Sequence, residues 1–216
     1  MIARPPLAVP LAALVVFLLL LTVAVGGWGP LAGLDADISD AFREYGATRP
    51  DLLTVLRIVT DAAAVLPFAV FGAVVAVALG VRAERVAAVC CATVTVLVPS
   101  LWGLLHQFLH HPRPADGFVV VHSNGFPSGH SANAAAAGLL VVLLIWPRTG
   151  RRGRILAVTL AAVFAGLVGL TRVALLAHWP ADVLGGWLLA LVVVPLAVRA
   201  VTGWRPAPAG PVSPAD

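Results

Sequence analysis

Polar residues suited to phosphate chemistry fall in three short strings of this chain, each at the edge of an apolar segment. The strings supply histidines, arginines, a serine and a carboxylate. Such side chains can bind a phosphate group and attack it with a histidine. In chain order the strings are His106-x6-Arg113-Pro114, Pro127-Ser128-Gly129-His130, and Thr171-Arg172-x5-His178-x3-Asp182.

The second string predicts a helix start that binds an anion. Serine is a favoured N-cap, and Ser128 stands directly before a long apolar run. Free N–H groups and a positive dipole end suit phosphate at a helix N-terminus, and Gly129 lets a ligand approach the backbone. An ordinary capped helix start would explain Ser128 and Gly129 but not the adjacent His130.

The third string predicts an oriented histidine beside an arginine. Asp182 follows His178 by four residues, close enough to hydrogen-bond one imidazole nitrogen and leave the other as a directed lone pair. Arg172 offers a planar fork of donors that matches phosphate oxygens. The alternative is that Arg172 snorkels to the membrane interface and Asp182 caps a helix. This alternative explains each residue taken alone, but it explains Arg172, His178 and Asp182 together less well.

The first string adds a second guanidinium, Arg113, in a loop that also holds three further histidines. His110, His111 and His122 are each interpreted as solvated loop residues. Asp116 is the one carboxylate between residues 106 and 122, and no Cys ligand or helix-spaced His pair accompanies these histidines. The sequence therefore predicts neither a metal site nor a cofactor.

The elements that must position these residues are membrane helices. Of 216 residues, 60% are hydrophobic and 11% are charged, against about 25% charged in a soluble domain. A membrane span needs about 20 apolar residues. Six segments qualify and predict one integral membrane domain over residues 1–205, with its core at 62–202 and a disordered tail at 206–216. The segments are about 7–28, 62–81, 86–106, 128–147, 154–172 and 181–202.

Arginine placement predicts the orientation. The chain has 14 basic residues, all arginine, and nine of them fall on the inner side if the N-terminus is cytoplasmic. All three strings then lie at the outer face. Residues 29–61 alternate acidic and apolar residues and predict one or two amphipathic helices at the outer interface, and 107–127 form a long loop.

The sequence thus predicts an all-α, six-transmembrane-helix bundle with both termini cytoplasmic and an extracytoplasmic interfacial helical segment. The arginine-rich, lysine-free composition suggests a bacterial plasma membrane protein. The run Arg148 to Arg154 is explained by membrane topology, so no nucleic-acid partner is expected. The oligomeric state is left open.

The three strings resemble the type 2 phosphatidic acid phosphatase family, part of the superfamily that includes vanadium haloperoxidases. Its pattern is Lys-x6-Arg-Pro, then Pro-Ser-Gly-His, then Ser-Arg-x5-His-x3-Asp. The resemblance implies that His178 attacks phosphorus, Asp182 orients it, and His130 protonates the leaving oxygen. It also implies a phosphate-binding set made of Arg113, Arg172, Ser128, Gly129 and, at the family's lysine position, His106.

The resemblance further implies a metal-independent hydrolase of a lipid phosphate or diphosphate. Undecaprenyl diphosphate is favoured, and phosphatidate and phosphatidylglycerol phosphate are the other candidates. Two alternatives stay open. One is a phosphotransferase that passes the phosphoryl group to an alcohol. The other is a catalytically weak lipid-binding or transport protein.

Two positions depart from the family pattern. Thr171 replaces the serine and keeps a hydroxyl, whereas His106 replaces a lysine. A lysine is a permanent cation at neutral pH, but a histidine titrates near about 6.5. A phosphate contact made by His106 would therefore depend on pH.

We predict that activity falls as the pH rises past the pKa of His106, because the protonated ring is the form that attracts phosphate. His106→Lys should flatten this alkaline limb. The measurement is kcat/KM against pH for both proteins. An unchanged profile in the lysine variant would contradict the prediction.

Overall fold

The computed structural model describes residues 2–121 and 123–203, and within these ranges the chain is helical without strands. The helices are α1 (Ala8–Val25), α2 (Gly29–Ala47), α3 (Pro50–Asp61), α4 (Val65–Val81), α5 (Arg85–Phe108), α6 (Gly129–Ile145), the 3-10 turn η1 (Trp146–Arg148), α7 (Arg151–Ala174) and α8 (Pro180–Gly203). The predicted tail at 206–216 and His122 lie outside the described residues.

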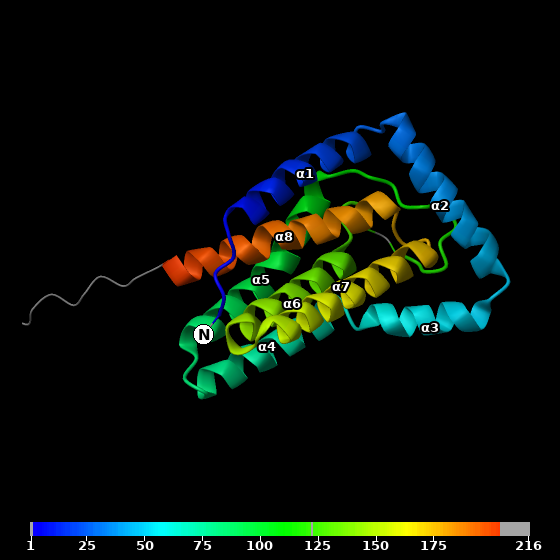
Figure 1. Ribbon diagram of the computed structural model, residues 1–216. Helices are drawn as coiled ribbons and strands as arrows, with labels where there is room; N and C mark the ends of the chain where they lie inside the picture. The colour runs from blue at the N-terminus through cyan, green and yellow to red at the C-terminus, as the bar shows by residue number, and fades with distance from the viewer. Residues whose placement is uncertain (1, 122, 204–216) are drawn as a thin grey trace, which may run out of the picture.

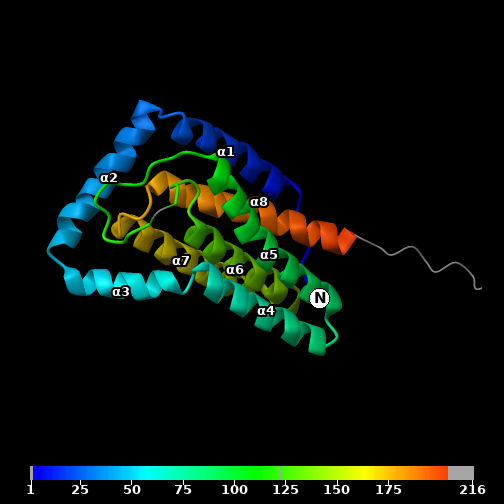
Figure 2. The same cartoon turned by 180° about the vertical axis from the view of Figure 1, so that it is seen from behind.

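Six helical stretches among the described residues are long and apolar enough to cross a membrane, as predicted. The second differs in detail from the expected 62–81, because α3 runs almost directly into α4 and the two form one apolar stretch, Pro50–Val81. The predicted helices within 29–61 are α2 and α3. Figures 1 and 2 show α2 lying across one end of the bundle.

Helices α6 and α8 form the centre of the bundle. In their membrane-spanning windows, 56% and 67% of the residues are buried, against 11–22% in the other four spans. The two helices approach closely where they begin. A Cβ on Gly186 would lie 2.4 Å from the Ser128 carbonyl oxygen, and the Ser128 N–H donates to the Asp182 carbonyl at 2.8 Å. This contact joins the second and third sequence strings.

The first described residues and the last turns of α6 and α8 lie together at the end of the bundle remote from α2 (Figure 1). Arg199 Nη1 donates to the Pro5 carbonyl at 2.8 Å, and the Ala3 N–H donates to the Leu143 carbonyl at 2.9 Å. The three sequence strings therefore lie at the end opposite the N-terminus, because α5, α6, α7 and α8 alternate in direction.

We predict that Gly186→Ala lowers stability by about 1–3 kcal/mol, because backbone at Ser128 occupies the space of the added methyl group. The measurement is the apparent Tm in detergent. Gly166→Ala is the matched control, since a Cβ at this helical position meets nothing within 4 Å. Equal Tm values for the two variants would contradict the close approach of α8 to α6.

Candidate active site

His178 lies in the short connection between α7 and α8 with only 2% of its surface exposed. Its Nδ1 is 3.3 Å from Asp182 Oδ2, and its Nε2 is 2.9 Å from Arg113 Nη1. A guanidinium can only donate, so Nε2 must accept with its lone pair. The ring proton therefore sits on Nδ1 and is donated to the carboxylate, which leaves the Nε2 lone pair facing Arg113.

Burial keeps His178 neutral. It lowers the pKa of His178 to about 4, against the opposing effect of Asp182 and with the help of the positive charges on Arg113 and Arg172. Neutral imidazole is the form that has a free lone pair. At neutral pH Nε2 thus keeps its lone pair, which accepts from Arg113 Nη1.

Asp182 is fully buried in the first turn of α8, where the helix dipole favours a negative charge. Besides facing His178, its Oδ2 accepts the Trp179 N–H at 3.0 Å. Its other oxygen, Oδ1, lies 3.1 Å from Nδ1 of His111. The carboxylate therefore stands between two histidines.

The interpretation of His111 as a solvated loop histidine is wrong. Only 12% of its side chain is exposed, and its ring packs edge-on to Phe126 with the ring centroids 6.3 Å apart. Burial lowers the pKa of His111. The contact with Asp182, the charge of Asp35 and the Ala24 carbonyl together raise this pKa by more, so the net shift is upward. Because two carboxylates and a carbonyl lie near its ring, the protonated form of His111 is favoured. Its neighbour His110 is exposed, as predicted.

Asp35 of α2 is a second buried carboxylate that the sequence analysis placed with the acidic residues of an interfacial helix. Its Oδ1 accepts the Ala181 N–H at the start of α8, at 3.0 Å. Burial raises the pKa of Asp35 to about 6, against the effect of this hydrogen bond. A usable signal was present in the sequence, since Asp35 shares a helical face with the apolar Leu31 and Phe42.

Arg113 is held by backbone and side-chain acceptors of its own loop. Its Nε donates to the Ser123 carbonyl at 2.7 Å, and its Nη2 donates to Ser123 Oγ at 2.9 Å and to the Asn124 carbonyl at 2.7 Å. Nη1 also donates to the Ala177 carbonyl. Burial lowers the pKa of Arg113, but arginine remains a cation at neutral pH. These contacts aim the guanidinium at His178.

Arg172 ends α7 with 5% of its surface exposed. Its Nη1 donates to Thr60 Oγ1 of α3 at 3.2 Å, while its buried Nε has no hydrogen-bond partner among the described residues. An unpaired donor on a buried cation is costly and suits an added anion. Thr60 was not singled out from the sequence, where nothing separates it from other helical threonines.

The second string begins α6 as predicted. Ser128 Oγ caps the helix, 3.5 Å from the Ser131 N–H, and accepts the Ser131 hydroxyl at 3.0 Å. His130 lies within electrostatic range of Arg113, Arg172 and His178. The structure shows a packing reason for glycine at position 129, and the expected approach of a ligand to its backbone stays a prediction. A Cβ on Gly129 would lie 2.7 Å from the Trp102 ring.

His106 faces the backbone of the second string. Its Nε2 lies 2.8 Å from the Pro127 carbonyl, which also accepts Trp102 Nε1 at 3.1 Å. A carbonyl only accepts, so Nε2 carries a proton and is engaged. Only Nδ1, which is buried and unpaired within the described ranges, is left for a substrate. His106 thus holds the loop before α6 at the position where the family has a cation.

The structure brings six of the eight predicted site residues around one point at the end of the bundle: His178, Asp182, Arg113, Arg172, His130 and the cap Ser128. His106 and Gly129 support this group through Pro127 and Trp102. An uncharged lone pair, the buried guanidinium of Arg172, the half-buried guanidinium of Arg113 and a second imidazole together suit in-line attack on a phosphorus atom and stabilisation of its charged oxygens.

Fold and site together define a multi-pass helical membrane protein whose buried histidines and arginines converge at one end of the bundle. A family model described as the PAP2 superfamily matches residues 45–206, and the chain belongs to this superfamily. The resemblance seen in the three strings and the predicted all-α, six-helix fold are thereby confirmed.

Two relatives from Bacillus subtilis extend this result. Phosphatidylglycerophosphatase B of strain 168 is 35% identical over 94 residues, which are 41% of this chain and 45% of that protein. The match thus spans less than half of this curated relative. The crystal structure of a transmembrane PAP2 type phosphatidylglycerolphosphate phosphatase is 25% identical, with a TM-score of 0.74 over 90% of this chain and 96% of that one.

We predict that His111→Gln lowers kcat for release of phosphate from a phosphate ester by about tenfold and His111→Leu by about a hundredfold, because a poorly fixed Asp182 lets the His178 ring turn out of its alignment. Glutamine keeps an N–H donor, so it should rescue part of the loss. KM should change little, since His111 does not face the phosphate. His110→Gln, at the exposed neighbour, is the control and should resemble wild type. A loss confined to KM would contradict this role.

Proposed function

We propose that this protein is a membrane lipid phosphatase that works through a phosphohistidine. The observation that carries the proposal is the state of His178, whose Nε2 lone pair is fixed by Asp182 on one side and faces Arg113 on the other. Membership of the PAP2 superfamily supports it. Phosphatidate, phosphatidylglycerol phosphate and undecaprenyl diphosphate are the candidate substrates.

The site residues divide the reaction into two steps. His178 Nε2 forms a bond to phosphorus while the bond to the lipid oxygen breaks, and His130 gives that oxygen a proton. In the second step His130 takes a proton from water, whose oxygen attacks phosphorus and releases His178 and phosphate. Arg172, through its unpaired Nε, and the first N–H groups of α6 bind the phosphate oxygens in both steps. Arg113 Nη1 gives up its contact with His178 Nε2 as that atom attacks, and its N–H then donates to a phosphate oxygen.

The positive charge for this chemistry comes from the two guanidinium groups and the α6 N-terminus. We therefore propose that the reaction needs no metal ion. Asp182 keeps the charge of the phosphorylated imidazole balanced, since its carboxylate stays 3.3 Å from Nδ1. The helix dipole of α8 stabilises the same carboxylate.

Among lipid phosphates we place phosphatidylglycerol phosphate first. The two Bacillus relatives carry this activity in their names, whereas the earlier preference for undecaprenyl diphosphate rests on analogy with small bacterial family members. The arginine distribution supports a plasma-membrane orientation with both termini cytoplasmic. The site, at the end of the bundle opposite the N-terminus, would then face the extracytoplasmic side.

We predict that the purified protein releases phosphate from at least one of these three lipids in the presence of a chelator. His178→Ala should reduce the rate by at least about a thousandfold, because the covalent step is lost. Orthovanadate should inhibit, since it mimics five-coordinate phosphorus. Activity that requires a metal ion, or that survives in His178→Ala, would contradict the mechanism.

A further inference from the structure

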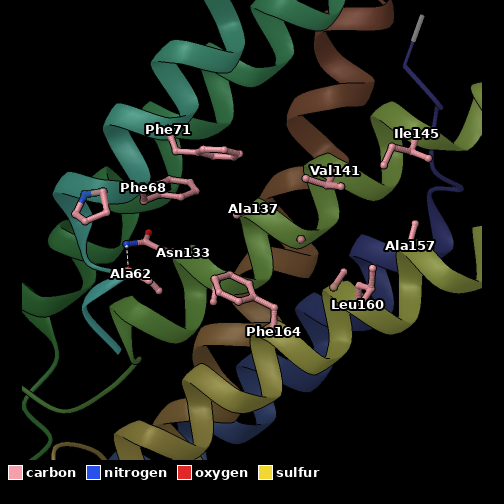
Figure 3. A pocket seen from close by; sticks show the side chains of 15 residues that line it. Ala62, Phe68, Phe71, Asn133, Ala137, Val141, Ile145, Ala157, Leu160 and Phe164 are labelled. Atoms are coloured by element: carbon pink, nitrogen blue, oxygen red, sulfur yellow. Dashed lines mark hydrogen bonds between the residues drawn. The ribbon is translucent and has the colours of Figure 1, made fainter. Parts of the chain in front are cut away.

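An apolar groove of about 570 Å³ runs between α4, α6 and α7. Figure 3 shows its floor at Ala137 of α6 and its two walls, with Phe68 and Phe71 from α4 facing Leu160 and Phe164 from α7. Its lining is almost wholly hydrocarbon, with Asn133 as the polar exception. This character suits an apolar occupant rather than water.

One end of the groove lies directly below the phosphate site. Asn133 follows His130 by three residues, so the two lie one above the other on α6, about one turn of 5.4 Å apart. Asn133 Nδ2 donates to the Ala63 carbonyl at 3.1 Å, and Thr60, one turn before Ala63, accepts from Arg172. The head of the groove is thereby tied to the elements that hold His130 and Arg172.

The rest of the groove leads away from the site and is open along its side. From Asn133 to Ile145 it follows 12 residues of α6, a length of about 18 Å. The wall residues Phe71 and Leu160 are 55% and 59% exposed, so the groove opens towards surrounding lipid. Small residues keep it hollow. α7 packs so closely on α6 that a Cβ on Gly138 would lie 2.9 Å from Ala161 Cβ.

We infer that this groove binds a hydrocarbon tail of the lipid whose phosphate lies at His178, and that it measures the length of that tail. The inference rests on the proposed function. A tail that leaves the bilayer for the groove gains little from burial, because lipid is as apolar as the groove. The groove acts through packing and direction instead: a seated tail places the phosphate ester in line with His178 Nε2.

A second apolar groove, of about 350 Å³, lies on the other side of the α6–α7 contact and is lined by α6, α7 and α8. None of its lining residues belongs to α3 or α4, and its polar atoms do not connect to Arg172 or His130. It therefore provides a matched control. Ala162 of α7 lines this second groove. Ala157 of α7 and Ala137 of α6 line the first groove.

The test compares kcat/KM for dioctanoyl and dioleoyl phosphatidylglycerol phosphate in detergent micelles. Ala157→Phe fills the far end of the groove and should lower kcat/KM for the dioleoyl lipid by about ten- to a hundredfold, while the dioctanoyl value stays within about twofold of wild type. Ala137→Phe fills the groove about 6 Å from Asn133, where both tails pass, and should lower kcat/KM for both lipids. Ala162→Phe should leave the ratio of the two substrates unchanged.

The possible results distinguish a groove that holds no tail from a protein that does not act on phosphatidylglycerol phosphate. If the wild type releases phosphate from both lipids and no variant changes their ratio, the groove does not hold the tail. A changed ratio in Ala162→Phe alone would assign the tail to the second groove and overturn the inference. If the wild type acts on neither lipid, the proposed preference for phosphatidylglycerol phosphate fails, and the inference falls with it.

A measurement on the unchanged chain covers the case in which a phenylalanine variant fails to fold. A substrate lipid with a photoreactive group at the end of one tail should cross-link to the wall around Val141, Ile145 and Ala157. Excess unlabelled substrate should suppress the cross-link. Labelling spread over all lipid-facing helices, or labelling that the competitor does not reduce, would overturn the inference.

Discussion

The buried carboxylate of Asp182 is the group around which the end of the bundle is built. A carboxylate with no exposed surface is stable only if its neighbours compensate its charge. Asp182 accepts a hydrogen bond from the Trp179 N–H and contacts the imidazoles of His178 and His111. It lies at the N-terminal, positive end of the α8 dipole. Its backbone carbonyl also accepts the Ser128 N–H, so the same residue fixes the start of α6.

The two arginines of the site carry positive charge that also needs compensation. Arg172 is withdrawn from water and its Nε has no acceptor in the described part of the chain, while the half-buried Arg113 adds a second positive charge beside it. Such groups are stabilised by an anion that arrives with its own negative oxygens. Asp182 cannot supply this, because it is already shared by two histidines. The uncompensated positive charge of Arg172 close to His178 is the physical reason that we propose this point as the position of the phosphate group.

The division between the polar end and the apolar shaft of the bundle follows from the membrane. Along the shaft, α4, α5 and α7 expose most of their surface, which lipid rather than protein covers. Polar side chains would be costly there, so they gather at the end where α2, the described loop residues 109–121 and 123–128, and the starts of α6 and α8 enclose them. The groove beside α6 joins the two regions, since it starts one turn below His130 and continues into the apolar shaft.

Sequence alone determined the number of spans, the helices within residues 29–61, and the three strings that hold the candidate site residues. These are local properties: apolar length, a capping serine, a four-residue spacing from His178 to Asp182. Tertiary structure decided what depends on contacts between distant segments. His111 meets Asp182 across 71 positions, Asp35 caps α8 from α2, and His106 turns to Pro127 rather than outward. No spacing rule encodes these pairs, because each depends on how helices pack after the spans have formed.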